Sequence, residues 1–233
     1  MTGMTQRKRS FPARFLRFGI KCALYFIGIS VALVIIFKFL QVPITATMMR
    51  DNNGAVREWT PLNEISANMA AAVIAAEDSK FCSHDGFDRE AIEKAIAYNK
   101  QGGRIRGGST ISQQTAKNVF LWQGGGFFRK GLEAWFTFLI EKIWGKPRIM
   151  EVYLNVAETG VGTYGAEAGA QRYFKKPVKQ LTRVEAARIA AALPQPKTRG
   201  VANARGFTRR YGNIIAARIN IVRRDGLNDC VTN

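Results

Sequence analysis

The sequence MAAAVIAAED (residues 69–78) predicts a short apolar helix that ends in two carboxylates. Met69, Ala72, Val73 and Ala76 recur at spacings of three and four residues, which is the period of one helix face. A carboxylate beside this apolar surface has its charged form disfavoured, the direction in which a general base is tuned. The alternative is a solvated acidic cluster, although acidic side chains at a helix C-terminus oppose the helix dipole.

Helical patterns continue along the chain, whereas alternating strand patterns are scarce and βαβ units are absent, so we expect a mainly α fold. A capping box, Thr182 to Glu185, precedes one of these helices, and Ser109 or Thr110 is suited to cap another. The expected helices are 89–100, 109–121, 128–144, 148–158, 186–193 and 207–224.

Length and charge limit the possible functions. The 233 residues allow one ordinary domain with an appendage, and a 47% hydrophobic fraction excludes a disordered chain. The net charge of +18 indicates an anionic partner: a nucleic acid, a membrane surface or a phosphorylated substrate. Seven basic and no acidic residues precede Pro43, and the remaining 28 basic and 17 acidic residues leave 28 − 17 = +11 on the body.

An uncharged run of sixteen residues, 22–37, predicts a membrane anchor. With its flanks it reaches about 20 residues, enough to span roughly 30 Å of hydrocarbon. The basic cluster on its N-terminal side predicts that this side stays in the cytoplasm. We therefore expect a basic cytoplasmic tail (1–19), a transmembrane helix (20–42), a linker (43–60) and an exported domain (61–233). A cleaved signal peptide and a buried core helix are the alternatives.

The three cysteines show no CxxC pair and no histidine at zinc-ligand spacing, which excludes a cysteine-based metal framework. Cys22 lies in the apolar run. Cys82 and Cys230 are far apart in the sequence, which gives no support for their pairing, although an oxidising compartment would permit it.

Two further segments carry candidate binding groups. Residues 107–118, GGSTISQQTAKN, put glycines and hydroxyls at a helix start and Lys117 two turns along, which suits an anion or a sugar as well as a plain polar cap. Arg129, Lys130 and Glu133 share one helix, where Arg129 and Glu133 could equally form an intrahelical pair. His84, taken alone, is more often structural than catalytic.

Together and in order, these segments resemble the peptidoglycan glycosyltransferase family, over about residues 67–196. The family comprises the glycan-polymerising module of bifunctional penicillin-binding proteins and the monofunctional biosynthetic transglycosylases. The sequence contains no SxxK or KTG, so the resemblance is to the monofunctional branch. The motifs are Glu77-Asp78-x-x-Phe81-x-x-His84-x-Gly86-x-Asp88, Gly108-Ser109-Thr110-Ile111-Ser112-Gln113-Gln114, Arg129-Lys130-x-x-Glu133 and Arg148-Ile149-x-Glu151-x-Tyr153-Leu154-Asn155.

The resemblance implies a lysozyme-like fold and polymerisation of lipid II into β-1,4 glycan strands by an inverting transfer from undecaprenyl diphosphate to the GlcNAc 4-hydroxyl. Glu77 would be the general base. Glu133 would assist departure of the diphosphate, directly or through a divalent cation such as Mg²⁺ or Mn²⁺, with no metal ligand assigned. Lys117, Arg129 and Lys130 would hold the diphosphate. The full set of implied substrate contacts is Asp78, Phe81, His84, Ser109, Thr110, Gln113, Gln114, Lys117, Asn118, Arg129 and Lys130.

The implied location is the inner membrane, crossed once, with the catalytic domain in the periplasm, and the implied partners are lipid II, the growing glycan, and cell-wall synthesis or division proteins. One departure is Gly124-Gly125-Gly126, because many relatives have Arg-Ser near this position. An arginine at the diphosphate or chain site is therefore expected to be missing. The rivals are a lysozyme-like hydrolase or lytic transglycosylase and a membrane-tethered nucleic-acid binder; export and the acidic motifs argue against nucleic acid.

Overall fold

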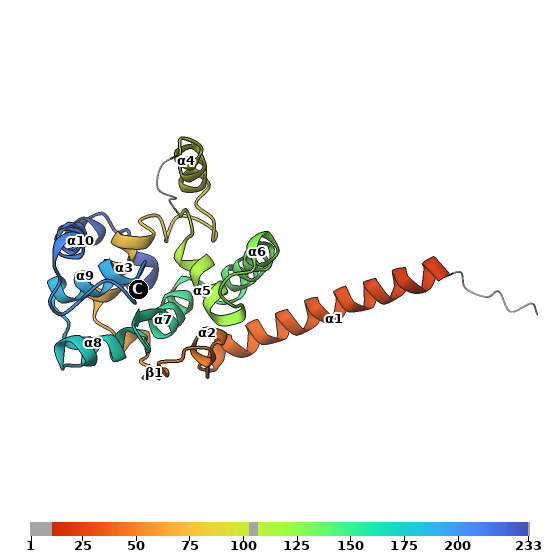
Figure 1. Cartoon of the computed structure of the whole chain (residues 1–233), viewed down its shortest axis with the longest axis horizontal. Coiled ribbons are helices and arrows are strands. Elements are labelled where there is room, and N and C mark those ends of the chain that lie inside the picture. Colours follow the sequence, from red (N-terminus) through yellow and green to blue (C-terminus); the bar gives the residue numbers. More distant parts are fainter. Residues whose placement is uncertain (1–10, 103–106, 233) are drawn as a thin grey trace, which may run out of the picture.

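The computed structural model describes residues 11–102 and 107–232 (Figure 1). The basic residues Arg7, Lys8 and Arg9 of the expected tail lie outside this part of the chain. The longer helices are α1 (Phe11–Phe39), α3 (Ala67–Glu77), α4 (Arg89–Lys100), α5 (Ile111–Phe120), α6 (Gly126–Ile143), α7 (Lys146–Val156), α8 (Ala166–Phe174), α9 (Arg183–Ala192) and α10 (Gly206–Arg224). The short elements are α2 (Ala46–Met49), η1 (Leu62–Glu64), η2 (Val178–Gln180) and α11 (Asp229–Thr232).

Helix α3 is the centre of one half of the globule. Its residues Met69 to Ala75 are all buried, and α3 packs against α9 and α10, beside which it lies in Figure 1. The alanines of α3 and α9 let the helix backbones approach closely. Ser66 caps the start of α3, and the extended backbone of Asp78 ends it. The predicted helix is confirmed, and its buried position places Glu77 at the edge of the core.

The other half is built from α5, α6 and α7, with α5 packed against both neighbours. The rings of Phe120 and Phe136 stack with centroids 4.4 Å apart between α5 and α6. Helix α4 projects from this body and has no buried residue among those that the structure describes (Figure 1). The expected capping box at Thr182 and Glu185 is present at the start of α9.

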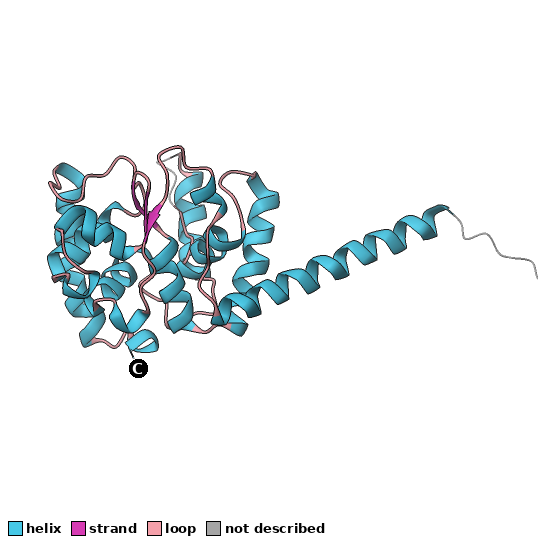
Figure 2. Ribbon diagram, turned by 90° about the horizontal axis from the view of Figure 1, so that it is seen from below, coloured by secondary structure: helices cyan, strands magenta, loops and turns pink. Residues whose placement is uncertain are grey.

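A small sheet with strand order β1–β3–β2 packs beside α8. Its strands are magenta in Figure 2. Strand β1 (Val56–Arg57) runs parallel to β3 (Thr163–Tyr164), and β2 (Glu158–Gly160) runs antiparallel to β3. These strands are too short to show an alternating pattern in the sequence. Residues 43–60, expected to be a linker, contain α2 and β1, so part of this segment packs on the globule.

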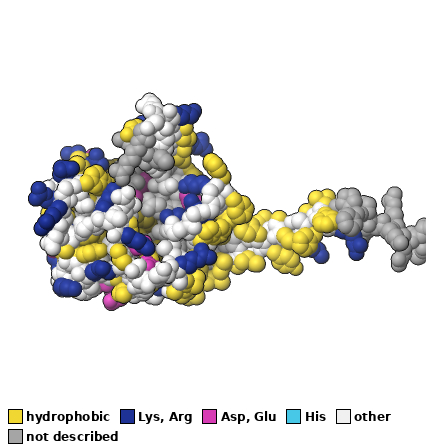
Figure 3. All heavy atoms as spheres, viewed as in Figure 1, with side chains coloured by type: hydrophobic (Ala, Val, Ile, Leu, Met, Phe, Trp, Pro, Cys, Tyr) yellow, Lys and Arg dark blue, Asp and Glu magenta, His cyan; other side chains and the backbone are white. Residues whose placement is uncertain are grey.

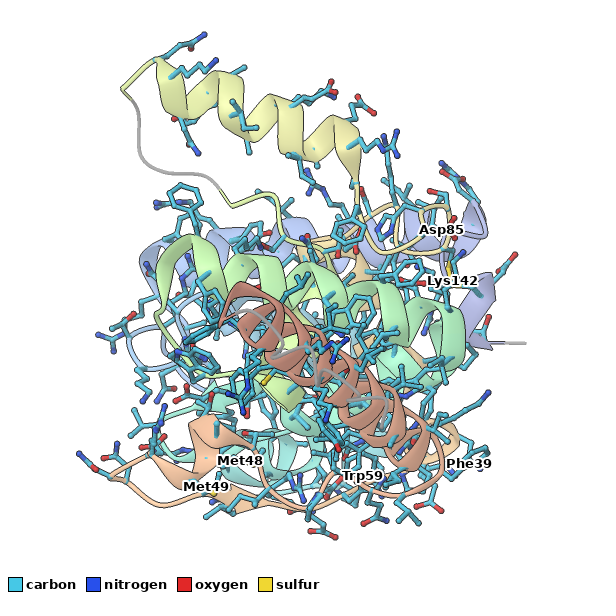
Figure 4. All side chains as sticks on the ribbon, turned by 90° about the vertical axis from the view of Figure 1, so that its right-hand side faces the viewer. Phe39, Met48, Met49, Trp59, Asp85 and Lys142 are labelled. Carbon is cyan, nitrogen blue, oxygen red and sulfur yellow. A yellow bond between two sulfur atoms is a disulfide. The ribbon has the colours of Figure 1, made fainter. Side chains whose placement is uncertain are left out.

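Helix α1 extends away from the globule and is mostly exposed, unlike a core helix (Figure 1). Its segment Arg14–Phe39 is long and apolar enough to cross a membrane. Its C-terminal half docks on the body: Trp135 Nε1 donates to Ser30 Oγ at 3.0 Å, and Trp144 Nε1 donates to the Val34 carbonyl at 2.6 Å. Figure 4 shows α1 crossing α6, with α4 on the opposite side of the body from the labelled Trp59.

Cys82 and Cys230 form a disulfide, with Cα atoms 5.6 Å apart across 148 residues of sequence. It ties the loop that follows α3 to α11, whose Val231 is buried. The sequence left this pairing open, because only the tertiary fold brings the two cysteines together.

Candidate active site

Glu77 is the last residue of α3, and few hydrogen bonds compensate the charge of its carboxylate. Gln114 Nε2 donates to Glu77 Oε2 at 2.9 Å. The other oxygen, Oε1, is buried and has no hydrogen-bond partner among the described residues. Burial raises the pKa of Glu77 and the charge of Asp78 adds to this, while the Gln114 hydrogen bond and Arg199 oppose it. A carboxylate in this state is suited to accept a proton.

Among the residues that follow Glu77, Asp78 and His84 are largely buried and hydrogen-bond to each other, and Asp78 also hydrogen-bonds to α5. Asp78 accepts from the backbone N–H of Ile111 at 3.0 Å, and His84 Nε2 lies 3.0 Å from both Asp78 oxygens. Gly86 N–H donates to His84 Nδ1, so Nε2 carries the ring proton that Asp78 accepts. Phe81 has no exposed surface. Asp78 therefore connects the segment after Glu77 to the start of α5, His84 holds Asp78, and Phe81 lies in the core. The substrate contacts predicted for these three residues stay predictions.

Helix α5 connects the two predicted carboxylate sites. Thr110 and Gln113 form the capping box at its start and are both buried, which accounts for the hydroxyl and amide at these positions. Gln114 and Lys117 follow on one face, three residues apart. Gln114 reaches Glu77, whereas Lys117 lies within the electrostatic influence of Glu133.

Glu133, on α6, is surrounded by positive charge. Its side chain is 3% exposed; Arg129 donates to Oε2 at 2.6 Å, and Lys130 pairs with Oε1 and also donates to Ser109 Oγ at 3.1 Å. Burial lowers the pKa of Lys117, repulsion from Arg129 and Lys130 lowers it further, and Glu133 opposes the shift. Within the described chain, this cluster contains three cations, Lys117, Arg129 and Lys130, and one carboxylate, Glu133. Its net charge is therefore 3 − 1 = +2, which suits the binding of an anion.

The glycine triplet at the start of α6 positions Arg129. Gly124, Gly125 and Gly126 have φ values of 83°, 89° and 54°, which side-chain-bearing residues rarely adopt. A Cβ at Gly125 would lie 2.9 Å from Arg129 Cβ, and Arg129 Nε donates to the Gly124 carbonyl. The turn thus holds Arg129 where its guanidinium reaches Glu133.

A hollow of about 350 Å³ lies beside α5, on the side of Gln114 and Lys117. Gln114 and Lys117 line it, and Tyr153 OH donates to Gln114 Oε1 at 3.2 Å. Asn118 also lines it. Figure 3 shows acidic side chains in the hollowed face of the globule, with Lys and Arg side chains around them. An uncompensated carboxylate beside a cationic cluster, on a helical domain with an apolar N-terminal helix, defines a group-transfer site for an anionic, membrane-associated substrate.

Comparison with known proteins identifies the family. Residues 44–220 match the family described as Transglycosylase. A biosynthetic peptidoglycan transglycosylase of Caulobacter vibrioides is 49% identical over 226 residues, which cover 95% of this chain and 98% of that protein. Proteins of the same name from Mannheimia succiniciproducens and Pseudomonas putida are 50% and 49% identical, covering 74% and 76% of this chain and 75% and 78% of those proteins.

The chain therefore belongs to the transglycosylase family. Its helical body is the lysozyme-like domain of that family, as the sequence motifs predict, and its activity is that of a peptidoglycan glycosyltransferase. One candidate residue escaped the sequence analysis: Glu158 also lines the hollow, and its buried Oε1 atom has no hydrogen bond among the residues described. No sequence motif identifies Glu158, because only the burial of its side chain in the folded protein distinguishes it.

Proposed function

We propose that this protein polymerises lipid II, with Glu77 as the general base and the Glu133 cluster as the site of the departing diphosphate. The family and its relatives support glycan-strand synthesis. The observation that supports the division of roles is the contrast between Glu77, which has one neutral partner and a free buried oxygen, and Glu133, which has a cation on each oxygen.

At the acceptor side, Glu77 removes the proton from the 4-hydroxyl of the GlcNAc of lipid II. The hydroxyl oxygen then forms a bond to the anomeric carbon of the growing chain, while the bond from that carbon to the diphosphate breaks. A single displacement converts the α linkage of the donor into a β-1,4 linkage. Burial of Glu77 favours this step because it raises the affinity of the carboxylate for a proton.

At the donor side, negative charge accumulates on the leaving diphosphate. Lys117, Arg129 and Lys130 supply the charge-assisted hydrogen bonds that stabilise it. Arg129 has enough donors to hold Glu133 and a phosphate oxygen together. Glu133 keeps the cations in place before the substrate arrives, so that little reorganisation is required during the reaction.

The protein side chains at the donor site do not fit a divalent cation held by the protein alone. Glu133 is already paired with two cations, and the described residues contain no group of three or more His, Cys, Asp or Glu side chains suited to a metal. We therefore assign the stabilisation of the diphosphate to Lys117, Arg129 and Lys130.

We further propose that α1 anchors the protein in the inner membrane with the globule in the periplasm. The basic N-terminal flank of α1 supports this orientation. The Cys82–Cys230 disulfide supports an oxidising compartment for the globule. Phe127 and Phe128, 98% and 73% exposed at the start of α6, place apolar side chains beside the diphosphate cluster, where the lipid portion of a membrane-bound donor would lie. Cell-wall synthesis or division proteins are the expected partners.

The test of activity is incubation of the purified full chain with labelled lipid II, followed by muramidase digestion of the product. We expect polymer that muramidase converts to disaccharide units. Cleavage of finished sacculi without polymer formation would identify a hydrolase or lytic enzyme instead.

The test of orientation is a reporter fused after Thr60. It should be active only outside the cytoplasm. Activity in the cytoplasm would contradict both the orientation and the assignment of a substrate presented on the outer leaflet.

A further inference from the structure

Glu158, at the start of β2, shares the unusual environment of Glu77. Its side chain is 16% exposed, and its Oε1 atom is buried with no hydrogen-bond partner in the described part of the chain. Burial raises the pKa of Glu158, and the nearby Asp51 adds to this, whereas Lys197 opposes it. A buried oxygen without a partner is destabilising, so it requires an explanation.

Glu158 forms a long ion pair with Lys197 and no hydrogen bond at its buried oxygen among the described residues. Lys197 Nζ lies 3.6 Å from Glu158 Oε1 and 3.6 Å from Asp51 Oδ2, too far for a hydrogen bond to either. Asp51 is satisfied otherwise, because Tyr164 OH and Asn53 donate to it. The Lys197 side chain is 52% exposed. Lys197 and Glu158 thus form a long ion pair, which leaves hydrogen-bonding capacity on both side chains.

Glu158, Tyr164 and Lys197 line the same 350 Å³ hollow as Gln114 and Lys117. The negative charge of Glu158 disfavours a second diphosphate here. A sugar fits better, because its hydroxyl and acetamido groups both donate and accept hydrogen bonds. A sugar donor would satisfy Glu158 while a sugar oxygen accepts from Lys197.

We propose that Glu158 and Lys197 form a glycan subsite that holds a hydroxyl or acetamido group of the growing strand in the hollow. This inference rests on the proposed polymerase function and extends it to residues outside the family motifs quoted above. Both residues act by binding, so their loss should weaken the hold on the glycan without removing the base or the diphosphate contacts.

The experiment measures three quantities for wild type and for Glu158→Ala, Glu158→Gln and Lys197→Met: lipid II polymerisation kinetics, thermal stability, and binding of a soluble β-1,4 GlcNAc–MurNAc tetrasaccharide without peptide or diphosphate. Glu158→Ala should weaken tetrasaccharide binding and raise KM by about tenfold, with kcat less affected. Glu158→Gln should retain most of the binding, because its amide oxygen still accepts a hydrogen bond. Lys197→Met should weaken binding similarly, and the exposed Glu64→Gln serves as the matched control.

Each outcome separates the alternatives. A purely structural role predicts lower melting temperatures for Glu158→Ala and Lys197→Met with unchanged KM and tetrasaccharide binding, and this would overturn the proposal. The proposal would also be overturned if Glu158→Ala weakened the binding of a peptide-bearing tetrasaccharide but not that of the peptide-free one. That result would indicate a peptide subsite. Failure of the wild type to polymerise lipid II would instead contradict the proposed function.

Discussion

Glu77 and Glu133 are both largely enclosed glutamates at helix positions that the sequence motifs single out, yet their surroundings are opposite. Glu77 receives one hydrogen bond from a neutral amide and keeps a buried oxygen without a partner in the described chain. Glu133 has Arg129 on one oxygen and Lys130 on the other. The surroundings therefore favour proton uptake at Glu77, whereas Glu133 is held between two cations.

This difference shows how one helix supports two chemical roles. Gln114 and Lys117, three residues apart on α5, present a neutral amide to Glu77 and a cation to the Glu133 cluster. The predictions below change one side of the comparison at a time.

The largest expected effect follows from Glu77→Gln, which keeps the shape of the side chain but removes the base. Loss of a general base typically lowers the rate by about 10² to 10⁴. Lipid II turnover should fall by this factor while the binding of a diphosphate glycolipid inhibitor stays close to wild type. Turnover within tenfold of wild type would remove Glu77 from this role.

On the other side, Arg129→Ala should act mainly on binding. It removes a charge-assisted contact worth about 1.5–3 kcal/mol, so donor affinity should fall by roughly tenfold to a hundredfold. Glu133→Gln should lower turnover with a smaller effect on inhibitor affinity. A simple surface pair predicts small and similar effects from both changes. Unchanged inhibitor affinity in folded Arg129→Ala would contradict the diphosphate assignment.

The disulfide secures the Glu77 side of the site rather than the Glu133 side, because Cys82 follows Glu77 by five residues. The double variant Cys82→Ser/Cys230→Ser should lose about 2–4 kcal/mol of unfolding free energy. The affinity for the diphosphate inhibitor should stay near that of wild type. Equal thermal stability of the oxidised and reduced wild-type protein would show that the disulfide contributes nothing.

Gln114→Met tests the tuning of Glu77. The Gln114 hydrogen bond lowers the pKa of Glu77, so its removal should raise that pKa further. Since the base must be ionised, the acidic limb of the turnover profile should move to higher pH. Turnover at acidic pH should fall by about threefold to tenfold, with a smaller loss at alkaline pH. An equal loss at every pH would point to a structural effect of the change.

The sequence predicts the features that depend on local chemistry. The bounds of α4, Arg89–Lys100, agree with the expected helix because Asp88 caps its start. The motif residues Gln114 and Lys117 line one hollow, Gln114 donates to Glu77, and Lys117 lies within the electrostatic influence of Glu133. Their roles in the reaction stay predictions.

What the sequence could not predict depends on long-range contacts. Strand β1 pairs with residues more than 100 positions away, and the disulfide depends on the docking of α11. Helix α8 was not predicted. Glu158 is identified only by the burial of its oxygen, and the supporting roles of Phe81 and His84 appear only once their burial and bonding are known.

The smallest and most direct test compares the stabilities of Glu77→Gln and Glu133→Gln in parallel denaturant titrations at neutral pH. The pKa of Glu77 is raised on folding, so its contribution to stability is lost as pH rises, and its ionised form is destabilising at neutral pH. Glu77→Gln should therefore be as stable as wild type or more stable. Glu133→Gln loses both ion pairs and should be less stable by about 1 kcal/mol. The same sign of change in both variants would contradict the assignment of opposite environments to the two glutamates.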